Sequence, residues 1–328
     1  MSRPIAAPIR YGAAPAPDLA PRAPGFWSQA CRRLLHNRLA AVSLVVLGLI
    51  VVAALFAPLI APHDPSTQDL TATFEKPSLD HLMGTDNLGR DWFSRVLYGA
   101  RVSLAIGLFA QVIVLTFGLP VGLIAGYCGR TADSLLMRFT DLVYAFPDLL
   151  LVILLRGALG GSIFTLFFII GLVSWVDIAR LVRGQTLSLK EREFVEAARS
   201  LGASNMDIMW RHLLPNMAGP LIVVVAFGIP RVIFIEASLS FIGIGVNPGV
   251  PSWGSMVQEG YAAFAGFPHL VLFPALAIAL LMLAFTFLGD GLRDALDPRT
   301  EVAPGREDAE IKAAPASRAP EREQRQAA

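Results

Sequence analysis

Four charged side chains lie in stretches of the chain that are otherwise apolar: Asp148, Asp177, Arg231 and Glu236. An unpaired charge at membrane depth costs several kcal/mol, so such side chains face either a partner helix or an aqueous path. Their chemistry would be ion pairing or contact with a polar solute, and not the making of covalent bonds. We therefore predict that these four residues line or gate a path through a membrane.

For Arg231 the sequence leaves two interpretations open. The side chain lines or gates a translocation path, or it forms a buried ion pair with a neighbouring helix. Glu236 cannot be its simple partner, because two residues five positions apart point about 140° apart on one helix. An ion pair would therefore need a partner on another helix.

The sequence lacks the local motifs that are typical of a catalytic site. The chain has only three lysines, and none lies in the G-x-x-x-x-G-K-[ST] frame of a nucleotide-binding loop. No H-x-x-x-H or C-x-x-C pair suggests a metal site, the five histidines are dispersed, and no nucleophile elbow is present. We expect no catalytic site, no metal and no cofactor, so the energy for any work would come from a gradient or from a partner.

Composition places the chain in a lipid bilayer. Of its 328 residues 54% are hydrophobic and only 16% are charged, and the mean hydropathy is +0.57. A soluble domain carries about a quarter charged residues. The 27 basic and 26 acidic side chains nearly cancel, which argues against a nucleic-acid partner, because a nucleic-acid binder shows a basic excess. The sequence thus predicts an all-α, polytopic membrane protein.

Runs of apolar residues predict about six transmembrane helices. A helix needs about 20 apolar residues to cross roughly 30 Å of hydrocarbon. The third run is the weakest, since Asp148 interrupts it. The predicted spans are residues 39–61, 102–129, 142–155, 162–176, 219–245 and 260–289.

Three glycines recur at every fourth position of the second predicted span. They are Gly118, Gly122 and Gly126. Small residues at this spacing form a stripe against which another helix backbone can approach closely. The stripe is therefore predicted to have a packing role, within this chain or against a partner subunit.

The positions of lysine and arginine predict the orientation of the chain, because these residues resist translocation. Six arginines precede residue 39, and six basic residues lie in the loop from 180 to 211. The 62–100 segment, in contrast, holds three basic residues against six acidic ones. Both termini and the middle loop are therefore predicted to be cytoplasmic, and the 62–100 segment external.

The predicted spans and orientation divide the chain into five parts. In chain order these are a cytoplasmic tail, a first transmembrane anchor, an external segment, a core with five helices and a second cytoplasmic tail: residues 1–38, 39–61, 62–100, 101–290 and 291–328. Residues 1–24 and 301–328 are rich in alanine, proline and charge, and we predict that they are disordered. No room remains for a large soluble catalytic domain.

The cytoplasmic loop of residues 188–215 has the pattern of a short amphipathic helix. Ser188 and Glu191 have the spacing of a capping box, which predicts a helix that begins near residue 189. One apolar stripe then follows the helical spacing i, i+3, i+4 and i+7: Phe194, Ala197, Ala198 and Leu201. The stripe predicts that this helix presents a single apolar face.

A glycine turn is predicted to join this helix to a second one. Gly202 would end the first helix in the left-handed conformation. Ser204 with Asp207 forms a second capping box, and Pro215 breaks the path before the next span. From these residues alone three interpretations stay open: a hairpin lying on the lipid surface, a docking element for a partner, and an internal gate.

The loop resembles the EAA loop of binding-protein-dependent ABC importers. The residues that carry the resemblance are Glu196, Ala197, Ala198, Gly202, Leu214 and Pro215. The spacing from the glycine to the Leu-Pro pair matches the family pattern. His212 stands where the general pattern has an isoleucine. A histidine is frequent at this position in the peptide-importer branch, so it indicates that branch of the family. In that family the loop carries the coupling helix that sits in a cleft of the ATPase subunit, and the resemblance implies the same role here.

Further motifs resemble the C-type permease subunits of dipeptide, oligopeptide and nickel importers. The resemblance runs from about residue 27 to residue 299. The motifs that carry it are Gly84-Thr85-Asp86, Gly89-Arg90-Asp91, Ser94-Arg95, and the segments 236–241, 251–254 and 289–298.

The resemblance implies a type I ABC importer permease fold in a bacterial inner (cytoplasmic) membrane. It implies four partner proteins: a second, B-type permease subunit, two ATP-binding ATPase subunits and an external substrate-binding protein. The chain would then form the translocation path without hydrolysing ATP itself. Dipeptides or oligopeptides are the implied cargo, although nickel chelates and other small solutes are carried by similar permeases.

Two other classes of protein stay open at this point. The intramembrane charges favour a secondary transporter driven by an ion gradient, but such a protein would usually show more spans and a duplicated architecture. A membrane scaffold that recruits a cytoplasmic partner would have no use for intramembrane aspartate, arginine and glutamate.

Overall fold

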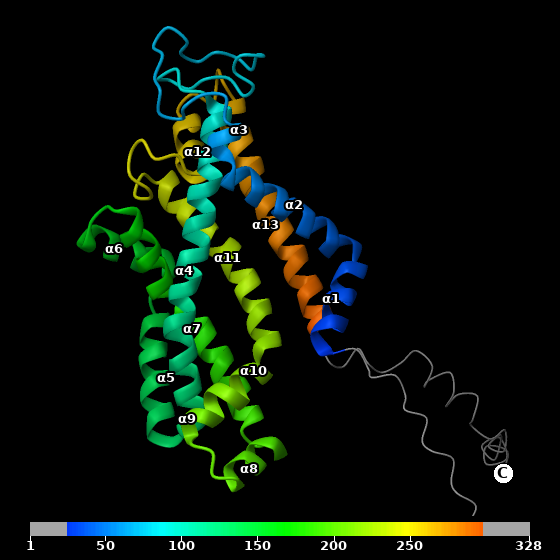
Figure 1. The fold of residues 1–328 in the computed structure, drawn as a ribbon. Helices are drawn as coiled ribbons and strands as arrows, with labels where there is room; N and C mark the ends of the chain where they lie inside the picture. The colour runs from blue at the N-terminus through cyan, green and yellow to red at the C-terminus, as the bar shows by residue number, and fades with distance from the viewer. Residues whose placement is uncertain (1–24, 298–328) are drawn as a thin grey trace, which may run out of the picture.

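The computed structural model describes residues 25–297 and is built from helices (Figure 1). The predicted disorder of residues 1–24 and 301–328 lies outside the described residues. The helices are α1 (Phe26–His36), α2 (Arg38–Leu55), α3 (Ala57–Ile60), α4 (Trp92–Cys128), α5 (Arg130–Tyr144), α6 (Asp148–Leu159), α7 (Ile163–Leu189), α8 (Glu193–Ser200), α9 (Asn205–Asp207), the π-helix η1 (Ile208–Leu213), α10 (Leu214–Asn216), α11 (Ala218–Phe241), α12 (Trp253–Tyr261) and α13 (His269–Leu296).

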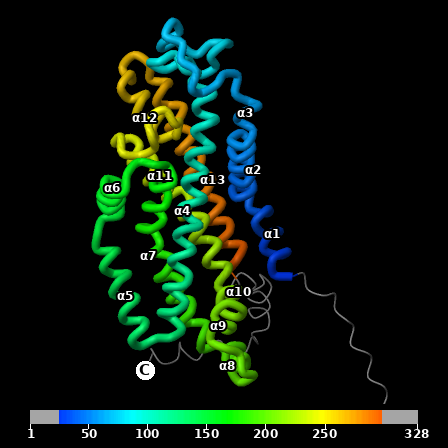
Figure 2. The backbone as a smooth tube through the Cα atoms, turned by 60° about the vertical axis from the view of Figure 1, so that its left-hand side comes forward, coloured from blue at the N-terminus to red at the C-terminus, as the bar shows by residue number. Residues whose placement is uncertain are grey.

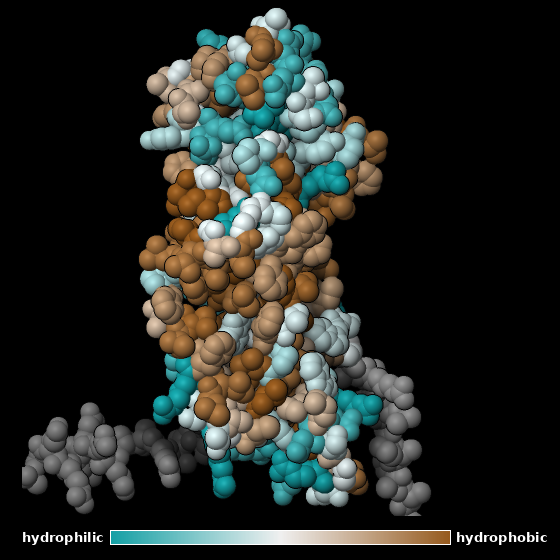
Figure 3. All heavy atoms as spheres, turned by 90° about the vertical axis from the view of Figure 1, so that its left-hand side faces the viewer, coloured by the Kyte–Doolittle hydropathy of each residue, from teal (hydrophilic) through white to brown (hydrophobic). Residues whose placement is uncertain are grey.

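Five of these helices are long and apolar enough to cross a membrane: α2, α4, α7, α11 and α13. A broken sixth span is formed if the bent pair of α5 and α6 is counted as one. On the face shown in Figure 3, an apolar belt crosses the middle of the molecule, and hydrophilic residues gather at both ends. This arrangement confirms the predicted all-α fold with about six spans.

The third predicted span, residues 142–155, is wrong as a single straight helix. Its residues are divided between α5 and α6, whose axes are bent by 85° at the break. Pro147 immediately precedes α6 and has no N–H to continue the hydrogen bonds of α5. The chain therefore turns sharply here, and Asp148 becomes the first residue of α6.

The fourth predicted span, residues 162–176, is too short. Helix α7 continues to Leu189 because ion pairs with α5 hold its charged second half. The guanidinium of Arg183 donates two hydrogen bonds to the carboxylate of Asp133, at 2.5 and 2.7 Å. Arg180 donates to Asp141 at 2.7 Å. The charged residues that end the apolar run at residue 176 thus lie within α7 and do not end the helix.

The glycine stripe of α4 packs against α7 of the same chain. A Cβ added at Gly118 would lie 2.7 Å from Ile178, and one at Gly126 would lie 2.6 Å from Thr186. At Gly122 it would lie 2.6 Å from both the Ala179 carbonyl oxygen and the Val182 side chain. The predicted packing role is confirmed, and the two backbones approach so closely that only glycine fits.

The two ends of the molecule carry different elements (Figures 1 and 2). The short helices α8 and α9, the start of α1 and the end of α13 lie at one end, while the segment before α4 and helix α12 lie at the other. Helix α1 falls within the predicted 1–38 tail and packs against α13. The sequence reasoning did not predict this helix.

A buried ion network fastens the segment between α3 and α4 to α12. The side chain of Arg95 is completely buried and pairs with Asp86 at 2.5 Å and with Glu259 at 2.6 Å. Arg90 joins the same two carboxylates at 2.7 and 2.8 Å. Burying these charges without their partners would be strongly destabilising, so the network fixes the position of the loop over the helices.

The α4–α7 contact gives a direct test. We expect Gly122→Ala to lower the stability by about 1–3 kcal/mol, because the new methyl group overlaps backbone and side-chain atoms of α7. Gly184→Ala is the matched control, since nothing lies within 4 Å of its Cβ position and alanine favours a helix. Thermal unfolding of the purified chain in detergent measures both. Equal unfolding midpoints for the two variants would contradict the close approach of α4 and α7.

Candidate functional site

The 188–215 loop begins later than its sequence pattern predicted. Ser188 lies in the last turn of α7, and α8 begins at Glu193, so the predicted Ser188–Glu191 capping box is wrong. Arg192 occupies the N-cap position of α8 without a side-chain cap. A serine is a preferred N-cap only where the chain leaves the helical conformation, and the continuation of α7 removes that condition.

The glycine turn that follows α8 is as predicted. Gly202 has a φ of +86°, in the left-handed region. The N–H of Ala203 donates to the carbonyl of Ala198 at 3.1 Å, which closes the helix end. At Ser204, the hydroxyl accepts from the Asp207 N–H at 3.1 Å and donates to the Asp207 carboxylate at 2.6 Å. This hydroxyl lowers the pKa of Asp207 below its ordinary value.

The predicted apolar stripe of α8 is divided between two environments. Ala198 is buried together with Val195, and both pack against η1, but the other members of the stripe are exposed. Leu201 is 89% exposed and Trp210 45%. Four large apolar side chains are thus turned away from the core at this end of the molecule: Phe194, Leu201, Met206 and Trp210.

The remaining residues of the EAA-like pattern lie in the same compact unit. Glu196 and Ala197 are exposed on α8, Leu214 is half-buried, and Pro215 is exposed in the first turn of α10. The chain ahead of Pro215 widens into the π-helix η1, an element that the sequence reasoning missed. A proline lacks an N–H and crowds the preceding turn, which is the available local signal for an irregular helix here.

Arg231, Asp148 and Asp177 meet in one charged cluster near the middle of the membrane-spanning helices. Arg231 donates to Asp148 at 2.7 Å and also hydrogen-bonds the carboxylate of Asp177. The three side chains come from α11, the first residue of α6 and the middle of α7. Arg231 is thus paired with two other helices, yet its side chain remains 49% exposed. The cluster combines an interhelical ion pair with an open face.

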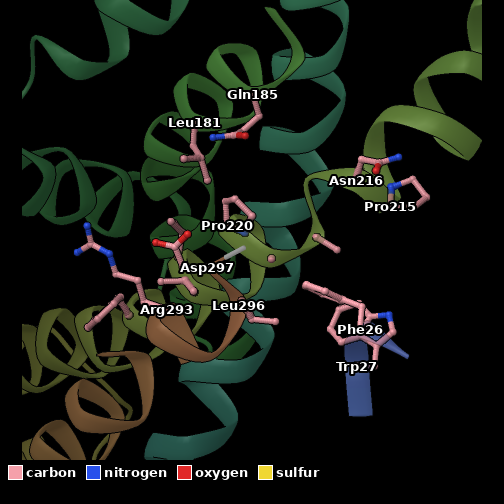
Figure 4. Close-up of a pocket in the computed structure, with 15 residues that line it drawn as sticks. Phe26, Trp27, Leu181, Gln185, Pro215, Asn216, Pro220, Arg293, Leu296 and Asp297 are labelled. Atoms are coloured by element: carbon pink, nitrogen blue, oxygen red, sulfur yellow. The ribbon is translucent and has the colours of Figure 1, made fainter. Parts of the chain in front are cut away.

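A series of adjoining cavities runs from one end of the molecule to this cluster. The largest, of about 820 Å³, lies between α1, the start of α11 and the end of α13 (Figure 4). It shares Val224 and Phe227 with a cavity of about 120 Å³ that reaches Asp177 and Arg231. Figure 4 shows Pro215 and Asn216, at the end of the 188–215 loop, beside the larger cavity. The 188–215 loop and the charged cluster therefore border the same series of cavities.

Glu236 is separated from this cluster. Its carboxylate is fully buried on another side of α11 and accepts hydrogen bonds from Ser240, Ser252 and Ser103, at 2.7, 2.8 and 3.4 Å. Ser103 also accepts from the backbone N–H of Trp253 at 3.3 Å. The structure thus brings together three of the four predicted pathway residues and places the fourth in a junction of α4, α11 and α12.

Arg156 is a buried cation that the sequence reasoning missed. Its guanidinium donates to the backbone carbonyls of Gly160, Ser162 and Gly245 at 3.0, 2.6 and 2.8 Å. These bonds hold the α6–α7 turn against the segment that follows α11. The signal in the sequence was an arginine directly after a predicted span.

Fold and site together define a class of protein: an all-α membrane permease, with an open charged cluster inside the apolar belt and a small helical unit at one end. Comparison with known families gives the particular assignment. Residues 118–302 match the model of the binding-protein-dependent transport system inner membrane component, and residues 25–77 match the N-terminal TM domain of oligopeptide transport permease C. The chain belongs to the family of binding-protein-dependent transport system inner membrane components.

Individual relatives agree with this assignment. The oligopeptide transport system permease protein OppC of Bacillus subtilis is 40% identical, over 89% of this chain and 96% of its own. The glutathione transport system permease protein GsiD of Escherichia coli O6:K15:H31 is 45% identical, over 83% and 90%. Among solved structures, the inward-facing MetNI methionine ABC transporter matches 62% of this chain and 97% of its own, with a TM-score of 0.51 and 17% identity. The last comparison supports the ABC importer fold.

The Glu236 junction generates a stability prediction. Glu236→Ala removes the acceptor of buried hydroxyl groups, and each one left unpaired costs about 1–3 kcal/mol. Glu236→Gln keeps one acceptor oxygen and a similar volume, so we expect a smaller loss. Thermal unfolding in detergent measures both, with the exposed Glu193→Ala as control. If Glu236→Ala unfolds at the same temperature as Glu193→Ala, the junction does not stabilise the fold.

Proposed function

We propose that this chain is the C-type permease subunit of an ATP-driven importer of dipeptides or oligopeptides. Its partners would be a B-type permease subunit, two ATPase subunits and an external substrate-binding protein. The names of the relatives support this cargo, since they are permeases of oligopeptide, dipeptide and glutathione transport systems. A gradient-driven secondary transporter is not favoured by these relatives.

The observation that carries the proposal is the exposed apolar surface of α8 and η1. Leu201 is 89% exposed at the end of α8, and Trp210 is 45% exposed where it lines a groove with Leu119 and Pro120 of α4. The same unit carries exposed charges such as Glu196 and Arg199. An exposed apolar patch with a polar rim is typical of a protein-binding surface. The EAA-like residues Glu196 to Gly202 lie within this unit, which supports docking to an ATPase subunit.

The distribution of charge supports an orientation with both termini and the 188–215 loop in the cytoplasm. The basic residues of α1 and of the loop lie at the same end of the molecule, and the segment that precedes α4 at the opposite end is richer in acidic residues. In this orientation the loop faces the compartment that contains ATP. The α4 end faces outward, where a binding protein would deliver its cargo.

The line of cavities supports a route for the cargo past Arg231. A peptide carries one cationic and one anionic end, and the cluster offers a cation together with two carboxylates on a half-exposed face. Closure of the ATPase pair would move the 188–215 unit as a rigid body. Because α10 leads directly into α11, this movement would reach the helix that carries Arg231.

Docking through the loop is tested by purifying the tagged chain with its partners from its host in mild detergent. We expect a second permease and P-loop ATPases to follow the chain. Gly202→Val should reduce recovery of the ATPases at least tenfold, because a β-branched residue is strained at a φ of +86°. Gly202→Asn should retain them, since asparagine tolerates this conformation. Recovery of ATPases with the valine variant at the wild-type level would refute docking through this turn.

Transport past Arg231 is tested with the complex in liposomes and a radiolabelled dipeptide. We expect Arg231→Ala to lower uptake at least tenfold while the ATPases still co-purify, because two carboxylates are left without their cation. Arg180→Ala is the control, since it also removes an arginine of α7 that pairs with α5, through Asp141 and the Tyr144 ring, but lies outside the Arg231 cluster. Normal uptake with unchanged substrate preference by Arg231→Ala would exclude this route.

A further inference from the structure

Three side chains that lie far apart in the sequence meet at the external end of the molecule. His63 follows α3, His81 lies in the irregular segment after it, and Asp91 is the N-cap residue of α4. Their ligand atoms all lie within 4.8 Å of one another. Neither the ion network of Arg95 nor the proposed transport route uses this cluster. The dispersed histidines of the sequence are thus, in two cases, neighbours in space.

The geometry points to a binding site for a divalent transition-metal ion of the Zn²⁺ class, formed by His63, His81 and Asp91. The Nδ1 atom of His81 lies 2.9 Å from Oδ1 of Asp91, and that of His63 lies 3.7 Å from the same oxygen. An ion bound tetrahedrally at about 2.1 Å would hold its ligand atoms about 3.4 Å apart. The observed distances bracket this value, so small side-chain rotations suffice to admit the ion.

The surroundings hold the three ligands in place. The second carboxylate oxygen of Asp91 accepts from the backbone N–H of Ser94 at 2.8 Å, which leaves Oδ1 facing the two imidazoles. The backbone N–H of His63 donates to the Ser94 hydroxyl at 3.2 Å, and that of His81 donates to the Ser78 hydroxyl at 3.1 Å. The first of these bonds orients the carboxylate ligand, as hydrogen bonds to the ligands do in metal sites, and the other two hold the backbone of the two histidines in place.

The donor set selects the kind of ion. Two imidazole nitrogens and one carboxylate suit Zn²⁺ and similar ions, whereas Mg²⁺ and Ca²⁺ prefer sites made of oxygen. Asp91 is buried, but the side chain of His63 is 45% exposed, so the site opens to the surface. Water would supply the fourth ligand of a tetrahedral ion. A bound ion would tie the start and the middle of the external segment to the first turn of α4.

Zn²⁺ binding is tested on the full-length chain in detergent, purified through a tag without histidine and stripped with a chelator. We expect one Zn²⁺ per chain in competition with a chromophoric chelator, and visible absorption bands when Co²⁺ is added instead. Zn²⁺ should raise the thermal unfolding midpoint, because an ion that binds only the folded chain stabilises it, and Mg²⁺ should not.

Variants distinguish this site from adventitious binding. His63→Ala and His81→Ala should each weaken Zn²⁺ binding at least tenfold and abolish the rise in the unfolding midpoint. His63 is substantially exposed, so its loss should leave the metal-free unfolding midpoint near the wild-type value. The control is the double variant His36→Ala and His212→Ala, which removes two histidines outside the cluster and should bind Zn²⁺ normally. The site would be overturned if His63→Ala bound Zn²⁺ as tightly as the wild type, or if the control variant lost binding. The three residues would then form only a hydrogen-bonded cap at the start of α4.

Discussion

The need to give every charge in an apolar environment a partner is the constraint on which this structure depends. Three buried or half-buried groups meet it in three ways. Arg156 is surrounded by backbone carbonyls, Glu236 by serine hydroxyls, and Arg231 by two carboxylates. The first two groups are enclosed by neutral dipoles and join segments of the chain that lie far apart. The third remains half-exposed, so of these three groups it alone offers a charged surface to a solute.

These contacts divide the bundle into a firm part and a looser part. Glycine contacts along α4 bring its backbone against α7, and the ion pairs of Arg183 and Arg180 add α5 to the same group. The start of α11, in contrast, borders a cavity of about 820 Å³. Further along α11 the packing is close again, since a Cβ added at Gly228 would lie 2.6 Å from the Gln111 side chain of α4. The looser part is thus confined to the start of α11 that borders the cavity.

The sequence was most informative where a local rule acts alone. Five apolar runs became membrane-spanning helices, and Gly202 adopts the left-handed turn that its position indicated. Local rules failed where contacts between distant residues determine the end of a helix or the partner of a charge. Arg183 and Asp133, 50 positions apart, extend α7 beyond its apolar run and so remove the helix start expected at Ser188. The partners of Arg231 could not be chosen from the sequence either, because Asp148 follows the 85° break between α5 and α6 and Asp177 lies on a third helix, α7.

The exposed apolar side chains of α8 and η1 have a consequence for how much of this chain persists in a cell. In the proposed assembly, the 89% exposed side chain of Leu201 stays uncovered until an ATPase subunit binds. Chaperones and proteases continuously remove chains that expose apolar surface. A copy made in excess of the proposed partners would then be removed although its helices are fully folded. The abundance of the chain would in that case follow the abundance of the proteins that bind it.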